Sequence, residues 1–166
     1  DRIDVLGPLG NGFDLGYKKP LLIGGGMGIA PLIFLAKQFS PQPVSVLIGG
    51  RCREELFWTD YFKDCCDALY ITSDDGCMGH KGFTPDILPK ILDNQKYDCI
   101  YACGPKPMLQ QIAQISRGTG IACQVSLEDY MACGIGACLS CTCETKHGRK
   151  KVCTDGPVFW AEEVLE

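Results

Sequence analysis

Short apolar runs alternate with helix-like stretches along most of this chain, from Pro20 to about Leu127. Five runs have the branched and aromatic side chains typical of buried strands, at residues 20–24, 43–50, 68–76, 98–104 and 121–127. Turns follow the first four, and amphipathic stretches come next, at residues 28–39, 53–62, 84–92 and 105–118. Because parallel strands need crossover connections that are usually helices, the alternation predicts an α/β fold with a five-stranded, parallel, doubly wound sheet.

The texture of the sequence changes after Leu127. Residues 128–166 are rich in glycine, cysteine and polar side chains, and they lack the pattern of a long helix. We therefore expect two domains, one over residues 1–127 that contains the sheet and a small one over residues 128–166 built around a bound metal. We also expect the last long helix to end at Gly118, which suits a C-cap.

Charge and composition argue against several classes of protein. The 166 residues carry a formal net charge of −4 and contain no cluster of Lys and Arg, which argues against nucleic-acid binding. No apolar run approaches the roughly 18 residues of a membrane span, and no signal peptide opens the chain. The chain begins at Asp1 without a methionine, so we expect a fragment of a longer protein.

Twelve cysteines exceed ordinary usage, and their even number invites a disulfide interpretation. Two observations weaken it. Cys99 and Cys103 lie inside an apolar, strand-like run, where a free cysteine behaves as a small hydrophobic residue. The chain also has enough Leu and Ile for an ordinary core, unlike a small scaffold that needs disulfides. We expect a reduced, cytoplasmic protein whose densest cysteine group binds a metal.

That dense group is the segment CGIGACLSCTC, residues 133–143. Cys133, Cys138 and Cys141 are spaced C-x4-C-x2-C, and Cys153 follows in KVCTDGPVF. This is the plant-ferredoxin spacing for a [2Fe–2S] cluster, which needs thiolates delivered from several directions. The sequence therefore predicts four cluster ligands, Cys133, Cys138, Cys141 and Cys153.

The glycines among these cysteines support a cluster over its alternatives. Gly134 and Gly136 permit positive φ angles and let backbone N–H groups approach cluster sulfurs. A structural zinc site usually has two C-x2-C knuckles, whereas this segment has one. Disulfides would not explain the glycines. Cys143 is expected in a strand, packed rather than ligating, although a role as an alternative ligand stays open.

A glycine-rich turn, GGGMGIAP at residues 24–31, joins the first predicted strand to the first helix. Its glycines do not fit the G-x-G-x-x-G pattern, so the motif alone is weak. A helix N-terminus with free backbone amides is nevertheless an anion site, and a proline suits the first helical turn. The candidate ligand-binding residues of this turn are Gly24, Gly25, Gly26, Gly28 and Pro31.

A second strand-to-helix junction, CGPKPM at residues 103–108, supports a nucleotide site. Ligands of such sheets bind outside the carboxyl ends of the strands, where both junctions should lie. The acidic residue expected directly after the second strand of an NAD site is missing, because the chain there reads GGRCREEL. Arg51 or Arg53 could contact a 2′-phosphate or simply be solvated, so the sequence chemistry leaves NAD and NADP open.

A nicotinamide and an iron–sulfur cluster transfer different numbers of electrons in one step, so they need an intermediary. Nicotinamide carries two electrons as a hydride, whereas a [2Fe–2S] cluster accepts one, and the usual intermediary is a flavin. No flavin site is evident in these residues. Either a flavin domain precedes Asp1 in the natural protein or the two sites do not communicate, and the abrupt start favours the first.

A resemblance to a known family rests on several motifs of the chain. They are GPLGNGFDL, GGGMGIAP, DDGCMGHKG, CGPKPM and the cysteine motif MACGIGACLSCTC with VCTDGPVF. From about Gly7 to its end, the sequence resembles the ferredoxin-reductase superfamily. It is most similar to the iron–sulfur electron-transfer subunits of B-type, NAD-dependent dihydroorotate dehydrogenase. The two cysteine motifs are specific in combination, whereas the glycine turn and CGP are shared by the whole superfamily. Ser140 stands where relatives often have glycine.

The resemblance implies a nicotinamide-dinucleotide site over residues 1–127 and a [2Fe–2S] domain over residues 128–166. In that family view Asp75 and Gly76 border the nucleotide site. The residues implied to lie near the nicotinamide ring are Cys103, Gly104 and Pro105. The resemblance assigns the cluster to the same four cysteines, and it assigns no catalytic residue to this chain.

The resemblance also implies further cofactors and partners. It implies an upstream FAD-binding β-barrel and a catalytic subunit with FMN, where dihydroorotate is oxidised to orotate, assembled as a heterotetramer. Electrons would pass from FMN through the cluster to FAD and then NAD, and this fragment alone would be inactive. One alternative is the diaphorase subunit of a cytoplasmic hydrogenase or of an NADH-dependent ferredoxin:NADP oxidoreductase. An alternative of another class is a non-catalytic metal-binding or redox-sensing module.

Overall fold

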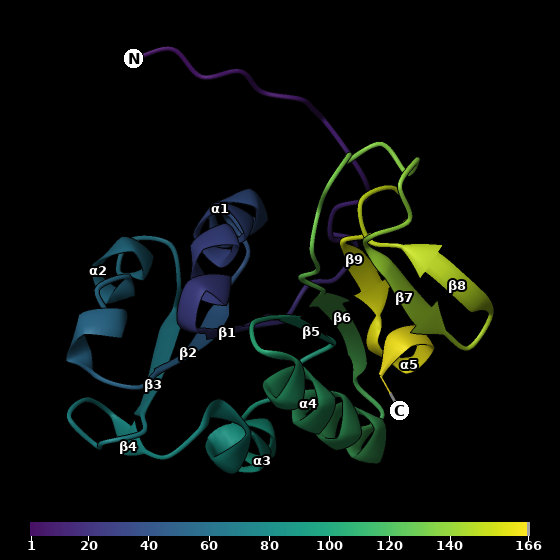
Figure 1. The fold of residues 1–166 in the computed structure, drawn as a ribbon. Coiled ribbons are helices and arrows are strands. Elements are labelled where there is room, and N and C mark those ends of the chain that lie inside the picture. The colour runs from purple at the N-terminus through teal and green to yellow at the C-terminus, as the bar shows by residue number, and fades with distance from the viewer. Residues whose placement is uncertain (166) are drawn as a thin grey trace.

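A computed structural model describes residues 1–165 and contains one seven-stranded sheet (Figure 1). Its order is β4-β3-β2-β1-β5-β6-β9, and every pairing is parallel except that of β9 with β6. Its strands are β1 (Pro20–Gly25), β2 (Ser45–Gly50), β3 (Ala68–Ser73), β4 (His80–Lys81), β5 (Cys99–Cys103), β6 (Ala122–Ser126) and β9 (Val158–Trp160). A separate antiparallel hairpin contains β7 (Thr142–Thr145) and β8 (Gly148–Lys151).

The helices cover both faces of this sheet. The short 3₁₀ turns are η1 (Gly26–Gly28) and η2 (Arg53–Glu55). The α-helices are α1 (Ile29–Phe39), α2 (Thr59–Phe62), α3 (Thr84–Asn94), α4 (Lys106–Thr119) and α5 (Ala161–Val164). In Figure 1, α1 and α2 lie on one side of the sheet, and α3 and α4 lie on the other. None of the helices in residues 1–165 has the length and apolar character needed to cross a bilayer.

The side-chain alternation of the central strands explains this double cover. Leu21 and Ile23 of β1 pack into the layer under α3 and α4, whereas Leu22 between them packs under α1. In β2, Leu47 points to the first layer, and its neighbours Val46 and Ile48 point to the second. Successive side chains of a strand face opposite sides, so a strand that is apolar at every position must be covered twice. The predicted fold class is therefore confirmed.

Two short strands extend the sheet beyond the five that were predicted. β4 has two residues and adds to β3 through the glycine-containing loop after Ser73. β9 comes from the cysteine-rich part and pairs antiparallel with β6, so that Val125 faces Phe159. Strands this short exist only through their partner strand, and so the local sequence gives little sign of them. The division of the chain at residue 127 stays a prediction.

Two helix predictions need correction. The single helix expected at residues 53–62 is two pieces, η2 and α2, because Leu56 between them turns into the core and is 1% exposed. The last long helix does not end at Gly118. It continues to Thr119 and ends at Gly120, whose φ of 69° is left-handed and whose N–H bonds to the carbonyls of Ser116 and Arg117.

The N-terminal segment runs along the sheet without forming a strand of its own. The Tyr101 hydroxyl donates to the Asp14 carbonyl at 2.8 Å, and the Asp14 N–H donates to the Gln124 side chain at 2.8 Å. The Phe13 ring packs edge-on against Tyr101 with 5.5 Å between centroids. Further back, Asn11 bonds to the Gly156 carbonyl at 2.6 Å. These contacts fasten the segment both to β5 and β6 and to the cysteine-rich part.

Candidate functional site

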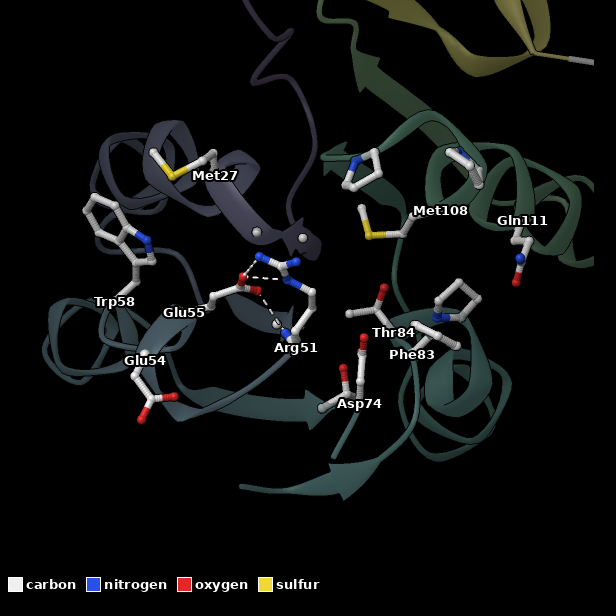
Figure 2. Close-up of a pocket in the computed structure, with 18 of the residues that line it drawn as sticks. Met27, Arg51, Glu54, Glu55, Trp58, Asp74, Phe83, Thr84, Met108 and Gln111 are labelled. Carbon is white, nitrogen blue, oxygen red and sulfur yellow. Dashed lines mark hydrogen bonds and ion pairs between the residues drawn. The ribbon is translucent and has the colours of Figure 1, made fainter. Parts of the chain in front are cut away.

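A cavity of about 580 Å³ opens at the carboxyl ends of the parallel strands (Figure 2). Its walls come from the turns after β1, β2 and β3, from the start of α3 and from the start of α4. Among the predicted residues, Gly25, Gly26 and Pro105 line it. Sequence reasoning missed other lining residues, namely Met27, Glu54, Glu55, Phe57, Trp58, Thr72, Asp74, Phe83, Thr84, Met108 and Gln111. The cavity lies at the sheet edge where ligands of such folds bind.

The two glycine-containing junctions behind this cavity pack directly against each other. A Cβ atom built on Gly28 would lie 2.3 Å from the carbonyl oxygen of Cys103, and one on Gly25 would lie 2.5 Å from the Met108 sulfur. Gly104 has a φ of 154°, and its own Cβ would lie 3.1 Å from the Gly25 nitrogen. Side chains at these positions would separate the turns, so the glycines are required by close approach.

The remaining predicted nucleotide residues stand behind or beside the cavity. Gly24 and Gly28 are buried under its floor, and Pro31 is on the exposed side of the first turn of α1. Cys103 is 3% exposed, and burial raises the pKa of its thiol, which keeps it protonated. Cys103 is therefore a core residue behind the junction, and it does not line the cavity. Whether these residues bind a nucleotide stays a prediction.

The turn after β3 likewise differs in detail from the prediction. Asp75 accepts a hydrogen bond from the Cys77 N–H at 2.9 Å, and this interaction with Cys77 lowers the pKa of its carboxyl group. Gly76, with a φ of 79°, completes the turn. Its neighbour Asp74 is the residue that lines the cavity. Asp75 and Gly76 therefore shape the loop that presents Asp74.

An ion pair sets the charge on one wall of the cavity. Nε of Arg51 donates to Glu55 at 2.6 Å, and the Arg51 backbone N–H donates to the same carboxylate at 2.9 Å (Figure 2). The hydrogen bond that the Arg51 side chain donates to Glu55 lowers the pKa of Glu55 and raises the pKa of Arg51. Glu54 and Asp74 add two more carboxylates to the lining, whereas Arg53 does not line the cavity. Three carboxylates against one paired guanidinium leave this wall acidic.

The four predicted cluster cysteines form two pairs, and they come from two segments, three from the loop before β7 and Cys153 from the turn after β8. The Cys138 N–H donates to the Cys133 sulfur at 3.4 Å, and the Cys153 N–H donates to the Cys141 sulfur at 3.4 Å. Cys141 and Cys153 are buried, Cys133 is half-buried and Cys138 is exposed. The structure thus brings together, two by two, cysteines that are 5 and 12 positions apart in the chain.

This two-by-two arrangement fits a binuclear cluster. A [2Fe–2S] cluster held by four cysteines takes two thiolates on each iron, so paired sulfurs are the expected pattern. The side chain of Ser140 lowers the pKa of Cys138 to about 6, which favours the thiolate that binds metals.

The loop backbone and the neighbouring residues agree with this fit. Gly134 and Gly136 have φ angles of 71° and 79°, as the sequence predicted. Nζ of Lys151 donates to the Gly136 carbonyl at 3.2 Å and brings a positive charge to the loop. Cys143 lies in β7 and packs against the buried group around Phe159, and burial raises the pKa of its thiol. Cys143 is therefore a packing residue in this structure.

Comparisons with known proteins define the class. Residues 128–165 match the family described as the iron–sulfur cluster binding domain of dihydroorotate dehydrogenase B. A solved structure of NADH-dependent reduced ferredoxin-NADP oxidoreductase is 36% identical, with a TM-score of 0.87 over 98% of this chain and 59% of that one. The chain is thus an iron–sulfur protein with a ferredoxin-reductase-like fold.

Curated relatives narrow the class to one family. The electron transfer subunit of dihydroorotate dehydrogenase B (NAD(+)) from Caldanaerobacter subterraneus subsp. tengcongensis is 42% identical over 99% of this chain and 67% of that protein. The corresponding subunit from Clostridium perfringens is 39% identical over the same shares. The chain belongs to this family of electron transfer subunits, which confirms the resemblance seen in the sequence. It spans about two thirds of the length of these relatives.

Proposed function

We propose that this chain carries electrons between an FMN site on a partner subunit and NAD, in the oxidation of dihydroorotate to orotate for pyrimidine biosynthesis. The observation that carries the proposal is the pairing of a nucleotide-sized cavity with four paired cysteines in one chain of this family. When bound, a [2Fe–2S] cluster supplies one-electron transfer, and FAD supplies the exchange between one-electron and two-electron steps.

In this proposal Cys133 and Cys138 hold one iron, and Cys141 and Cys153 hold the other. Support comes from the two backbone N–H groups that already point at sulfurs of these pairs, because such hydrogen bonds stabilise thiolate charge. The buried pair anchors the site to the core around Phe159, whereas the exposed pair faces outward. The exposed side is the natural direction for electron exchange with a partner.

The cavity at the sheet edge is proposed to bind NAD rather than NADP. Backbone at Gly25 and Gly26 leaves room for a pyrophosphate, and the rings of Trp58 and Phe83 provide apolar walls. A 2′-phosphate would need a free cation, but Arg51 is already paired with Glu55. The other carboxylates of the lining would repel that phosphate and suit ribose hydroxyls instead.

The partners of the chain are also proposals. The printed names of the relatives support a separate catalytic subunit, which we take to be the FMN-containing dihydroorotate dehydrogenase, in a cytoplasmic heterotetramer. We further propose that an FAD-binding β-barrel belongs to the third of the relatives' length outside the match, and that these 166 residues alone do not turn over dihydroorotate.

The test combines metal analysis with nucleotide binding on anaerobically purified protein. We expect about two irons and two acid-labile sulfides per chain, with visible absorption that bleaches on dithionite. Titration with NADH should quench the fluorescence of Trp58, which lines the cavity. Zinc or no metal would refute the cluster, and an unchanged fluorescence together with no heat of binding would refute the nucleotide site.

A second candidate is the related subunit of an NADH-dependent reduced ferredoxin-NADP oxidoreductase. The 36% identity and the TM-score of 0.87 to that structure favour it. The two candidates differ in the partner. Co-expression with a dihydroorotate-oxidising FMN protein should give a stable complex that reduces NAD with dihydroorotate under the first candidate. Failure of that complex to form, with capture of an NADPH-oxidising flavoprotein instead, would favour the second.

A further inference from the structure

The Ser140 side chain occupies a specific position between the two halves of the cysteine loop. Its Oγ lies 3.2 Å from the Cys138 sulfur and 3.2 Å from the carbonyl oxygen of Tyr130. It also accepts a hydrogen bond from the Ala132 N–H at 3.3 Å. One hydroxyl therefore touches a proposed cluster ligand and two residues of the segment that leads to Cys133.

The backbone holds this hydroxyl next to the sulfur. Leu139, between Cys138 and Ser140, has a φ of 63° and is the one non-glycine residue with positive φ in the described chain. The Thr142 hydroxyl donates to the Leu139 carbonyl at 2.7 Å and fixes this turn from the other side. The turn places residue 140 beside Cys138, and the hydrogen bonds of the Ser140 hydroxyl to Tyr130 and Ala132 hold its side chain there.

A serine hydroxyl has one hydrogen, and here two acceptors compete for it. A cysteine sulfur that ligates iron carries no hydrogen, so in the 3.2 Å pair with a ligated Cys138 only the serine can be the donor. The same hydroxyl can instead donate to the Tyr130 carbonyl. A hydrogen bond to a charged acceptor is also stronger than one to a neutral carbonyl.

We propose that Ser140 is a positioning residue that stabilises the reduced state of a cluster bound through Cys138. The inference rests on the proposed role of Cys138 as a ligand. If a bound cluster took up one electron from a reductant such as dithionite, the negative charge on the Cys138 sulfur would increase, and the serine hydrogen would turn from the Tyr130 carbonyl to that sulfur. No proton is transferred in this step. Hydrogen bonds to cluster sulfurs are among the factors that set reduction potentials.

The test is a reductive titration of the anaerobically purified, cluster-containing chain with dithionite, followed by its visible spectrum. Ser140→Ala should shift the one-electron reduction equilibrium about fivefold toward the oxidised form, which is roughly 41 mV at 59 mV per tenfold change. Ser140→Thr keeps the hydroxyl and should stay within twofold of the unmodified chain. Thr145→Val is the matched control, because it removes a hydroxyl that donates to the Gly148 carbonyl in the β7–β8 hairpin and has no role in the Cys138–Ser140 turn.

Each outcome decides the proposal. An alanine variant with two irons and an unchanged equilibrium would overturn it, as would an equal shift in the Thr145→Val control. If the alanine variant fails to retain the cluster, Ser140→Gly removes the same hydroxyl and leaves the turn more freedom. Loss of the cluster from both, with retention in the threonine variant, would mean that the serine only holds the loop, and would also overturn the proposal. An unmodified chain without iron would refute the proposed function itself.

Discussion

A substitution at Gly28 tests whether the two junctions behind the cavity must touch. A Cβ at this position would meet three backbone atoms, the Cys103 oxygen at 2.3 Å, the Cys103 carbonyl carbon at 2.5 Å and the Gly104 nitrogen at 2.6 Å. Gly28 itself has an ordinary helical φ of −63°, so alanine suits the backbone conformation and only the space is missing. To restore the 3.0 Å below which Cβ contacts are essentially never seen, the turns must separate by about 0.7 Å, the difference from 2.3 Å.

We expect Gly28→Ala to lower both stability and nucleotide affinity. Overpacking of a tight contact costs about 1–3 kcal/mol. For a chain of this size such a cost lowers Tm by roughly 2–12 °C. Separating the junctions also moves Pro105 relative to Gly25, and both line the cavity, so NADH should bind more weakly. Circular dichroism melting measures the first effect, and fluorescence titration of Trp58 measures the second.

Gly118→Ala is the matched control for this experiment. Gly118 lies within α4, and a Cβ there would meet nothing within 4 Å. Replacing glycine by alanine in an open helical position stabilises by about 0.5–1 kcal/mol. The same chemical change should therefore have opposite signs at the two positions. If Gly28→Ala melts at the temperature of the unmodified protein and binds NADH equally well, the required contact between the junctions is refuted.

Three further predictions concern charge, ligation and pH. Glu55→Gln should release Arg51 and raise the affinity for NADPH relative to NADH in parallel titrations, and an unchanged ratio would show that the ion pair does not set the preference. Cys153→Ser should lose iron in a metal assay, whereas Cys143→Ser should keep it; equal retention would contradict the ligand assignment. Burial raises the pKa of Cys123 to about 12, against about 8.5 for an unfolded thiol. Its contribution to stability is complete below pH ~8.5 and is lost by about 1.4 kcal/mol per pH unit above that value. Urea unfolding should therefore show a shallower alkaline loss in Cys123→Ala, and an equal slope would contradict the shift.

The central fold was predictable because its signal is local. The three central strands β1, β2 and β5 are apolar at consecutive positions, so their burial on both faces follows from composition. The end of α4 was predicted wrongly because the local sequence offers two equivalent positions. Gly118 and Gly120 are both glycines near the end of the helical pattern, and only the hydrogen bonds of the folded chain select Gly120.

The two candidate sites also differ in how much of each the sequence predicts. The cysteine spacing predicted the four residues that lie in pairs in the structure. This was possible because the spacing of ligands is visible over a short stretch of the chain. The cavity wall was less accessible to sequence reasoning. Glu55 was overlooked because the acidic residue was expected directly after β2, yet it lies five residues beyond Gly50 and reaches back to Arg51. An Arg and a Glu four residues apart, just after a strand, were the available signal.

The sheet relates the two candidate sites in a way that bears on electron transfer. β5 and β6 end together, with Cys103 opposite Ser126, and β9 starts at Val158 opposite the same Ser126. The cavity is reached through the turn after Cys103, and the cysteine loop follows Ser126, so both open from one edge of the sheet. Under the proposed function, a carrier that exchanges electrons with both sites would lie over this edge of the sheet. Because three paired strands join the two sites, their relative position is set by backbone hydrogen bonds rather than by a flexible linker.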